Sequence, residues 1–406
     1  MKTSPKVLII FGFIMSMVSC AAFAAIEIDK TAAVTSTATR PVTPQALLDD
    51  FKYGAIMNDW GCATGTYGSS GSCTASYVSD SNAYSGQTLK LVYDVSTSGS
   101  YAGYYSKLGS QDLSGYTTIS FYIRSDFGGD FFKIELKNTG TNADTNASSV
   151  YISDYLDSGV TTAWQYVTIP LHAFANISDW TSGLEFGIVF QNSQANANLC
   201  PTSGVVYIDN ITFGTSAVTS VNINKFGNLL GRCALGGNMG STPNEYPTSP
   251  GARYTITSAD YYTSPHSMLS EYNVASGDGW AGHYLLFGGG SSGWTTVAHN
   301  FSGLNYLSFY VKARTAAENP KVFKIEMIDN YGTRYYVVTG ISTGWQFIKI
   351  PLSSITSDGT TGGTVLDKTS IKQMNFTYEK WRIEYASGQS SGNGAVYIDD
   401  IRFTKL

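Results

Sequence analysis

Each half of the chain contains a strand-like segment in which an aromatic ring and a cation lie two residues apart. Tyr122 precedes Arg124 in the first half, and Tyr310 precedes Lys312 in the second. Side chains two apart on a strand project to the same side. Aromatic rings stack on the apolar C–H patches of sugars, and charged side chains hydrogen-bond sugar hydroxyls. These positions therefore predict a face that binds a polysaccharide.

Two further segments in each half carry rings of the same kind. The string YAGYYSKLG at 101–109 matches WAGHYLLFG at 280–288. A later segment of the first half contains Tyr151 and Asp154, and the second half has Tyr335 in the related place. A single tyrosine of this kind usually packs under a loop. The recurrence of the whole set favours a binding face.

Carboxylates allow a second interpretation, a polysaccharide hydrolase or lyase on a jelly-roll scaffold. Glu135, Asp154 and Glu185 are the residues that would act, and Glu326 stands where the second half matches Glu135. Glycosidases need two facing carboxylates, and the chain has no compact E-x-D-x-E arrangement. Its two G-x-S-x-G strings lie in Gly/Ser-rich stretches, without the strand and helix of a nucleophile elbow. Binding without catalysis is the favoured interpretation, with the enzyme as the alternative.

The second half of the chain repeats the first. DLSGYTTISFYIRS (112–125) matches NFSGLNYLSFYVKA (300–313), TAWQYVTIPL (162–171) matches TGWQFIKIPL (343–352), and GVVYIDNITF (204–213) matches GAVYIDDIRF (394–403). Short alternating segments separated by turn residues predict strands, and no long stretch has helical periodicity. We therefore expect an all-β chain with two tandem β-sandwich domains.

The repeats and the N-terminus set the expected boundaries: a signal peptide at 1–24, a flexible leader at 25–45, a first module at 46–214, a linker at 215–220 and a second module at 221–406. The two modules are called repeat one and repeat two below. Lys2 and Lys6 precede a short apolar run that ends before Ala22-Phe23-Ala24, which is the pattern of a cleaved export signal. The alternative is a lipoprotein anchored through Cys20 after Met17-Val18-Ser19. A secreted or periplasmic protein is expected.

Composition excludes one class of partner. Charged residues make up 14% of the 406 residues and the net charge is −5, which gives no support for nucleic-acid binding, since that calls for a basic patch. The apolar run near the N-terminus is shorter than the ~20 residues that span a bilayer, and no other stretch is apolar enough.

Four cysteines remain after the export signal: Cys62, Cys73, Cys200 and Cys233. An even number in an exported protein indicates disulfides, and four cysteines allow three pairings. Cys62–Cys73, across a Gly/Ser-rich loop, is the simplest pair, and it leaves Cys200–Cys233.

The ordered motifs DDFKYG (49–54), LSGYTTISFYIRS (113–125), VYISDYL (150–156) and VYIDNITF (206–213) resemble the jelly-roll carbohydrate-binding modules of secreted bacterial polysaccharide degraders. The nearest are those of the family 11 type, within the galactose-binding-like sandwiches. The resemblance covers nearly all of repeat one and, more loosely, repeat two. It implies a concave sheet face that holds a β-glucan chain, with contacts from Tyr122, Arg124, Tyr151, Asp154, Tyr101, Tyr104 and Glu185. A structural or assembly module with the same sandwich is a third interpretation.

The same resemblance implies a structural calcium near the ends of each module. In repeat one, Asp49 or Asp50 with Asp209 would supply carboxylate oxygens, which calcium prefers. Repeat two keeps Asp399 but has Asn224-Lys225 where repeat one has Asp49-Asp50. Calcium is therefore expected in repeat one more than in repeat two, and repeat two is expected to bind a different glycan or none.

Overall fold

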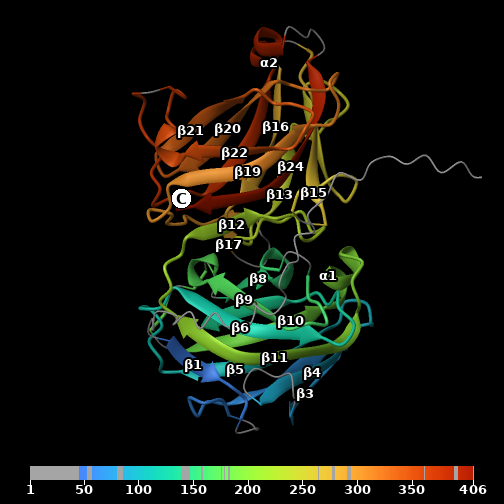
Figure 1. Cartoon of the computed structure of the whole chain (residues 1–406), viewed down its shortest axis with the longest axis vertical. Coiled ribbons are helices and arrows are strands. Elements are labelled where there is room, and N and C mark those ends of the chain that lie inside the picture. The colour runs from blue at the N-terminus through green and yellow to red at the C-terminus, as the bar shows by residue number, and fades with distance from the viewer. Residues whose placement is uncertain are drawn as a thin grey trace, which may run out of the picture. The chain divides into compact units, whose positions relative to one another are not determined.

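The computed structural model describes residues 45–52, 57–79, 86–138, 147–156, 159–174, 176–177, 179–181, 183–263, 265–276, 279–289, 294–360, 362–387 and 392–405. The expected signal peptide, Cys20 and nearly all of the leader lie outside these residues. In the described part of the chain, the two repeats are all-β sandwiches, which confirms the predicted fold class (Figure 1).

Repeat one consists of two antiparallel sheets. The six-stranded sheet has the order β3 (Ser72–Ser79), β4 (Gln87–Asp94), β11 (Ser203–Gly214), β6 (Thr118–Ser125), β9 (Gln165–Pro170), with β1 (Gln45–Asp49) also paired to β11. The five-stranded sheet has the order β2 (Thr64–Ser69), β5 (Tyr101–Gly109), β10 (Leu184–Gln191), β7 (Lys133–Asn138), β8 (Ala147–Tyr151). Short helices η2 (Ile152–Asp154), η3 (Leu171–Ala173) and α1 (Asn192–Ala197) follow β8, β9 and β10.

Repeat two has the same two sheets in the same order. Its six-stranded sheet runs β14 (Gly251–Thr257), β15 (Ser267–Asn273), β24 (Asn393–Thr404), β19 (Tyr306–Ala313), β22 (Gln346–Pro351), with β12 (Ser220–Asn224) also paired to β24. Its five-stranded sheet runs β13 (Met239–Thr242), β16 (Trp280–Leu286), β23 (Gln373–Glu379), β20 (Val322–Asp329), β21 (Gly332–Thr339). It also has the pair β17 (Gly288–Gly289) and β18 (Thr295–Thr296), and the helices η4 (Leu352–Ser354) and α2 (Lys380–Ser387).

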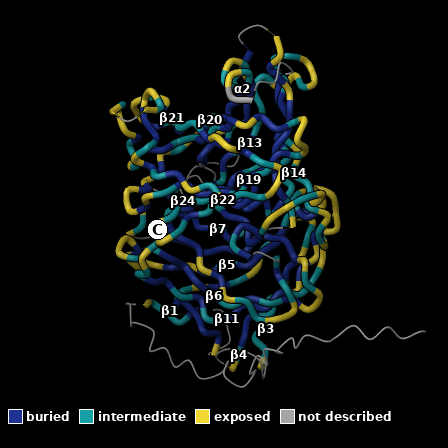
Figure 2. Tube along the Cα trace, turned by 45° about the horizontal axis from the view of Figure 1, so that its top comes forward, coloured by how far each residue is buried: buried dark blue, intermediate teal, exposed yellow. Residues whose placement is uncertain are grey.

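The period-two alternation of the strands builds both cores. In β6, Ile119, Phe121 and Ile123 are fully buried between the sheets, while Tyr122 and Arg124 point away. Strand β19 does the same with its apolar residues. Figure 2 shows buried backbone concentrated in the strands and exposed backbone in the connecting loops. Each sheet therefore has one face in the core and one open face, and the functional residues must lie on the open faces.

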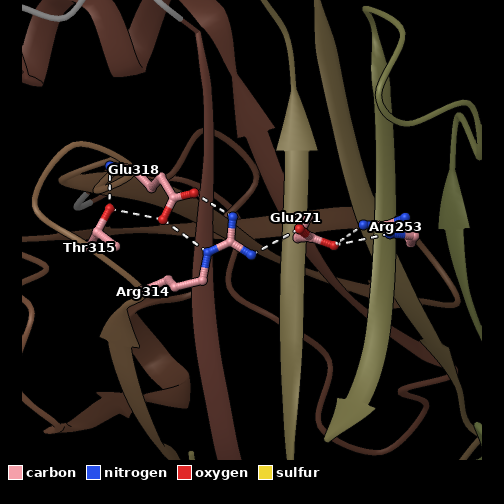
Figure 3. Close-up of polar contacts among 5 residues, drawn as sticks. All are labelled: Arg253, Glu271, Arg314, Thr315 and Glu318. Carbon is pink, nitrogen blue, oxygen red and sulfur yellow. Dashed lines mark hydrogen bonds and ion pairs between the residues drawn. The ribbon is translucent and has the colours of Figure 1, made fainter. Parts of the chain in front are cut away.

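An ion-pair network fixes one loop of repeat two (Figure 3). Glu271 on β15 accepts hydrogen bonds from Arg253 of β14, at 2.6 Å, and from Arg314, at 3.0 Å. Arg314 also pairs with Glu318, whose carboxylate accepts a 2.8 Å hydrogen bond from Thr315. Because Glu271 is almost fully buried, these cations compensate its desolvation. The network therefore anchors the loop between β19 and β20 to the sheet.

Candidate functional site

The open face of the five-stranded sheet in repeat one carries three tyrosines from two neighbouring strands. Tyr101 and Tyr105 alternate with Gly103 on β5, and Tyr67 lies opposite Gly103 on β2. A Cβ atom at Gly103 would lie 2.8 Å from the Tyr67 ring, and one at Gly65 would lie 2.9 Å from the Tyr105 ring. The glycines therefore allow each ring to lie over the neighbouring strand, where it presents an apolar surface.

A row of paired charges runs beside these rings. Lys137 and Glu185 form an ion pair of 2.7 Å between β7 and β10, and Lys133 lies 3.5 Å from Glu135 on β7. The Lys137 ammonium is 6.0 Å from the centre of the Tyr67 ring. Burial and the nearby carboxylates raise the pKa of Tyr67, so its hydroxyl stays a hydrogen-bond donor at neutral pH. This face can stack rings on a ligand and hydrogen-bond its hydroxyls.

Repeat two carries the corresponding set on its five-stranded sheet. Trp280 and Tyr284 alternate with Gly282 on β16, in the places of Tyr101 and Tyr105 in repeat one. A Cβ atom at Gly240 of β13 would lie 2.1 Å from the Tyr284 hydroxyl oxygen, so this ring also lies over a glycine of the neighbouring strand. Half of the Trp280 surface is exposed.

Polar side chains converge on Glu326 in the middle of this face. Its carboxylate accepts hydrogen bonds from Asn375 at 3.0 Å and Thr377 at 3.1 Å, and it lies 2.8 Å from the Lys324 ammonium. Lys324 also bonds Glu379 at 2.6 Å. Burial opposes ionisation of Glu326, but these hydrogen bonds outweigh it and lower its pKa. The result is a fixed, ionised network in a partly buried position.

Two adjoining hollows lie over this network, with volumes of about 240 and 210 Å³. Trp280, Glu326 and Thr377 line both of them, and Tyr284 and Asn375 add to the larger. An aromatic wall beside convergent polar groups is the usual composition of a small-ligand site.

Tyr335 of β21 closes one side of this face. It lies opposite Glu326 in the sheet register, and its hydroxyl donates a 2.6 Å hydrogen bond to the carbonyl of Asp358. The Lys324 ammonium is 5.1 Å from its ring centre. The place of Tyr335 in repeat one is taken by Ser149, which lies opposite Glu135.

The open face of the six-stranded sheet carries a different aromatic cluster, which also occurs in both repeats. In repeat one, Arg124 lies 3.8 Å from the ring centre of Tyr207 and 5.4 Å from that of Trp164, while Tyr122 lies 4.8 Å from Tyr166. In repeat two the members are Lys312, Tyr397, Trp345, Tyr310 and Phe347, with Tyr262 stacked on Tyr310 at 3.7 Å.

The structure therefore divides the predicted site residues between two faces. Tyr101 and Glu185 share the five-stranded open face of repeat one, and Tyr335 lies on its counterpart in repeat two. Tyr122, Arg124, Tyr310 and Lys312 lie on the six-stranded open faces, so they do not join that set.

Two of the predicted ligand contacts are almost completely buried. Tyr104 is 0% exposed and points into the core, because it is three residues from Tyr101 and so faces the opposite side of β5. Asp154 is 1% exposed in η2, where it accepts a 3.0 Å hydrogen bond from Asn228 and its carbonyl accepts one of 2.6 Å from Asn222. Both assignments are corrected: Tyr104 belongs to the core, and Asp154 belongs to a contact with the first residues of repeat two.

Tyr151, another predicted ligand contact, is also largely buried. It lies on the edge strand β8 opposite Lys133, stacks on Phe131 at 5.3 Å and is 5% exposed. Burial raises its pKa, and nearby Arg232 of repeat two counteracts this. Repeat two therefore lies against Tyr151, whereas Ser149 on the same strand and its counterpart Tyr335 in repeat two are both partly exposed.

The predicted metal ligands of repeat one lie together with a carboxylate that the sequence analysis missed. Among the described residues, one group of three ligand atoms, from Asp49, Asp50 and Asp59, falls within 4.8 Å. Burial, together with the neighbouring carboxylates Asp59, Asp50 and Asp209, raises the pKa of Asp49 to about 7, although a hydrogen bond from the Phe51 amide acts in the opposite direction. One oxygen of Asp49 is buried without a hydrogen-bond partner. The donor set and this oxygen fit a hard cation such as calcium.

The counterpart in repeat two offers fewer carboxylates. Asn224 replaces Asp49, and its amide donates to the carbonyl of Arg232 at 3.1 Å. One oxygen of Asp399 accepts hydrogen bonds from the backbone amides of Tyr262 and Thr263 at 2.7 and 3.0 Å, and the other is buried without a hydrogen-bond partner. Among the described residues, only repeat one brings three carboxylates together.

All four described cysteines are free thiols, so neither predicted disulfide is formed in the structure. Cys233 donates to the carbonyl of Leu286 at 2.9 Å, and Cys200 donates to that of Asn198 at 3.4 Å. Burial raises the pKa of both Cys73 and Cys233 to about 12, which makes them poor nucleophiles. No helix in the described residues is both long and apolar enough to cross a bilayer.

Sequence reasoning missed most of the five-stranded open face. Tyr67, Tyr105, Trp280, Tyr284, Lys324, Asn375 and Thr377 are the main omissions. One pattern could have predicted part of this face: an aromatic ring, a glycine and a second ring at alternate positions in both 101–105 and 280–284. Alternate residues of a strand point to the same side, so the two rings and the glycine share one face. The flanking strands carry no such pattern.

Two duplicated β-sandwiches with ring-bearing open faces define a tandem of carbohydrate-binding modules. The family profile of Carbohydrate binding domain 30 matches residues 53–215 and 238–405, and the chain belongs to this family. No curated protein matches the chain.

Solved structures with similarity include modules of three families. A family 11 module from Clostridium thermocellum, in complex with a beta-1,3-1,4-mixed-linked tetrasaccharide, is 18% identical over 42% of this chain and 96% of its own, with a TM-score of 0.33. A family 30 module is 22% identical over 46% and 88%, with a TM-score of 0.33. A tandem of two family 22 modules from Paenibacillus barcinonensis is 12% identical over 90% and 99%, with a TM-score of 0.30.

Proposed function

We propose that this chain is a secreted, non-catalytic protein that binds plant cell-wall polysaccharide of the β-glucan type on its five-stranded open faces. The observation that carries the proposal is the ring that lies over a glycine at the same place in both repeats, Tyr105 over Gly65 and Tyr284 over Gly240. A ring held in this way offers a flat apolar surface. Because its orientation is already restricted, it loses little side-chain entropy when a ligand binds. Flat rings beside fixed hydrogen-bonding groups match the two surfaces of a pyranose.

The charge balance of these faces favours a neutral glycan. In repeat two, Lys324 and Arg382 are matched by Glu326 and Glu379, each in an ion pair. A uronate or sulfated chain would have to compete with carboxylates already bonded to these cations. A neutral chain needs only to hydrogen-bond groups whose positions are fixed.

Two modules on one chain add avidity when both engage the same polysaccharide. The gain depends on the effective concentration of the second site once the first is bound. Inactivating either face alone should therefore weaken binding to a long polymer more than binding to a short oligosaccharide.

Affinity electrophoresis and calorimetry with mixed-linkage β-glucan, xyloglucan and xylan test the proposal. Retardation in the β-glucan gel, without release of new reducing ends during incubation, is the expected result. Release of reducing ends that disappears in Glu135→Ala or Glu185→Ala would instead establish a hydrolase or lyase. The alternative site on the six-stranded open face predicts that Tyr122→Ala and Tyr310→Ala abolish retardation, whereas the five-stranded face predicts that they do not.

The sequence pattern of an export signal at 1–24 supports the secreted location. Mass spectrometry of the mature protein should find an N-terminus near Ala25. A lipidated Cys20 would move the protein to a membrane surface and contradict cleavage at that point.

We also propose a structural calcium in repeat one, held by Asp49, Asp50 and Asp59 with Asp209 nearby. An ion there neutralises buried carboxylates, so it would stabilise the folded state by about 2.7 kcal/mol at one hundred times its Kd. Chelation should lower the melting temperature of the parent but not of Asp49→Asn. The matched variant in repeat two, Asp399→Asn, should keep the chelator response; an unchanged melting temperature of the parent on chelation would contradict the site.

A further inference from the structure

Helix α2 of repeat two begins where the five-stranded open face ends. Strand β23 ends at Glu379, which lies opposite Trp280 in the register, and α2 starts at the next residue. Figure 1 shows α2 at the ends of the strands, next to β16. A ligand that follows the rings of the open face past Trp280 would therefore reach this helix.

One buried side chain and one ion pair hold α2 in place. Ile383 is buried and packs in the core of repeat two. Arg382 pairs with Glu379, the last residue of the strand. Glu379 is in turn bonded to Lys324, so the helix is tied to the polar network of the open face.

Arg382 also positions an exposed ring. Its guanidinium carbon lies 4.2 Å from the centre of the Trp381 ring and 5.7 Å from that of Tyr335, the ring that closes the open face. Cation–π contacts of this length restrict the orientation of a ring that is otherwise in solvent. Trp381 is 59% exposed, so a large aromatic surface is held in one orientation without being buried.

Single exposed apolar residues are common and need no function. Trp381 differs from such residues in that repeat one lacks a ring at the matching position. Gln191 lies opposite Tyr101 as Glu379 lies opposite Trp280, which aligns the starts of α1 and α2. The places of Trp381 and Arg382 are then taken by Ser193 and Gln194, so the ring and its supporting cation occur together in repeat two and are both missing in repeat one.

We propose that the glycan site of repeat two extends from the sheet onto α2, where Trp381 stacks on an additional sugar unit beyond Trp280. The inference rests on the proposed function and adds to it: repeat two takes a longer stretch of polysaccharide than repeat one. Arg382 acts as a positioning residue for the ring. Short oligosaccharides fill the sheet face alone, so only longer ones gain from Trp381.

Calorimetry with β-1,4- and mixed-linkage gluco-oligosaccharides, from trimer to heptamer, tests this in the full mature chain. The background carries Tyr101→Ala and Tyr105→Ala, which remove two of the three rings of repeat one. In this background, Trp381→Ala should leave the affinity for the shortest bound oligosaccharide unchanged and weaken the longest about tenfold, the size of one lost stacking contact. Trp381→Phe should retain most of the affinity.

Two controls separate the subsite from general damage. Ser193→Ala, at the matched position of repeat one, should have no effect at any length in the parent. Tyr385→Ala tests whether any exposed ring on α2 matters, since Tyr385 is 89% exposed and lies one turn further along. An equal loss for Tyr385→Ala and Trp381→Ala would contradict the assignment to Trp381.

The outcomes also distinguish the inference from the proposed function. Equal affinity of Trp381→Ala and the background for every length overturns the extension but leaves the sheet site intact. A loss that is the same for short and long oligosaccharides places Trp381 inside the basic site and also overturns the extension. Absence of binding in the background while the parent binds overturns the extension and assigns the site to repeat one, and absence of binding in the parent overturns both.

Discussion

The two repeats share one architecture but use the same edge of the five-stranded sheet differently. In repeat one the end of the edge strand β8 and the helix η2 are covered, so Tyr151 and Asp154 serve packing. In repeat two the counterpart strand β21 keeps Tyr335 beside the hollows over Glu326. The sequence motif that looks most like a known binding module, VYISDYL, therefore marks a buried contact. The repeat that lacks the motif has the more complete open face.

This comparison bears on an expectation from the sequence. Repeat two was expected to bind a different glycan or none because it lacks the family strings. The structure gives it a tryptophan in place of Tyr101, a polar network around Glu326 and two hollows. The motif VYISDYL belongs to the buried contact around Tyr151 and Asp154. Its absence from repeat two therefore says little about whether repeat two has a ligand site.

The largest effect is expected when both rings of repeat two are removed. Trp280→Ala with Tyr284→Ala, in the Tyr101→Ala background, should weaken oligosaccharide binding at least about a hundredfold, because each stacking ring contributes on the order of 1.4 kcal/mol or more. Calorimetry measures the change. The reciprocal variant, with Tyr101→Ala and Tyr105→Ala alone, should leave one full site; a larger loss in this variant than in the first would restore repeat one as the principal site.

A smaller effect, on stability, is expected from the ion-pair network of repeat two. Arg314→Ala leaves the nearly buried Glu271 with Arg253 alone and frees Glu318, so the free energy of unfolding should fall by about 2 kcal/mol. Denaturant titration measures it. Arg253→Ala is the matched control, since more than half of this arginine side chain is exposed, and its effect should be below about 1 kcal/mol. Equal effects would mean that the network does not anchor the loop through Arg314.

The smallest effect concerns the covered edge of repeat one. Burial raises the pKa of Asp154 from 3.8 to about 7, with opposing contributions from Lys225 and Asn228. The folded state therefore holds the proton more tightly than the unfolded state, so stability is full below about pH 4 and falls as the pH rises through 7. Asp154→Asn keeps an oxygen for Asn228 and cannot ionise. The pKa shift corresponds to roughly 4 kcal/mol, but the substitution also removes the attraction between the ionised carboxylate and Lys225. At pH 8 it should therefore exceed the parent by only about 1 kcal/mol in free energy of unfolding.

The pH series supplies its own control for Asp154. The difference between Asp154→Asn and the parent should shrink as the pH is lowered to about 4. A difference that does not change with pH would show that the substitution acts through packing, and that Asp154 ionises as an ordinary exposed carboxylate does.

The sequence predicted the fold well because the signals that build it are local. The repeated blocks, the alternation in segments such as 119–124 and the turn residues between them are sufficient for two tandem β-sandwiches. The assignment of residues to faces was less reliable. Tyr101 and Tyr104 were grouped although a spacing of three places them on opposite sides of a strand, and Tyr105 was the residue that shares the open face.

Other features of the site could not be read from the sequence because they depend on strand order. Tyr122 and Tyr101 each alternate with core residues along their strands, as residues of an open face should. Only the strand order shows that β6 and β5 belong to different sheets. Asp59 lies near Asp49 in space, and nothing in the sequence pairs these two carboxylates. The burial of Asp154 depends on Asn222 and Asn228, which are more than sixty residues away in the chain.

The central claim is that glycan binds to the five-stranded open faces and not to the aromatic clusters of the six-stranded faces. Calorimetry of two variants, each with four substitutions, tests it most directly. In the first variant Tyr101, Tyr105, Trp280 and Tyr284 are changed to alanine. In the second, Tyr122, Tyr166, Tyr310 and Phe347 are changed to alanine. Both sets point away from the core, so both variants should fold. The account predicts that the first loses binding to mixed-linkage β-glucan while the second binds like the parent. Retained binding in the first variant together with loss in the second would contradict it.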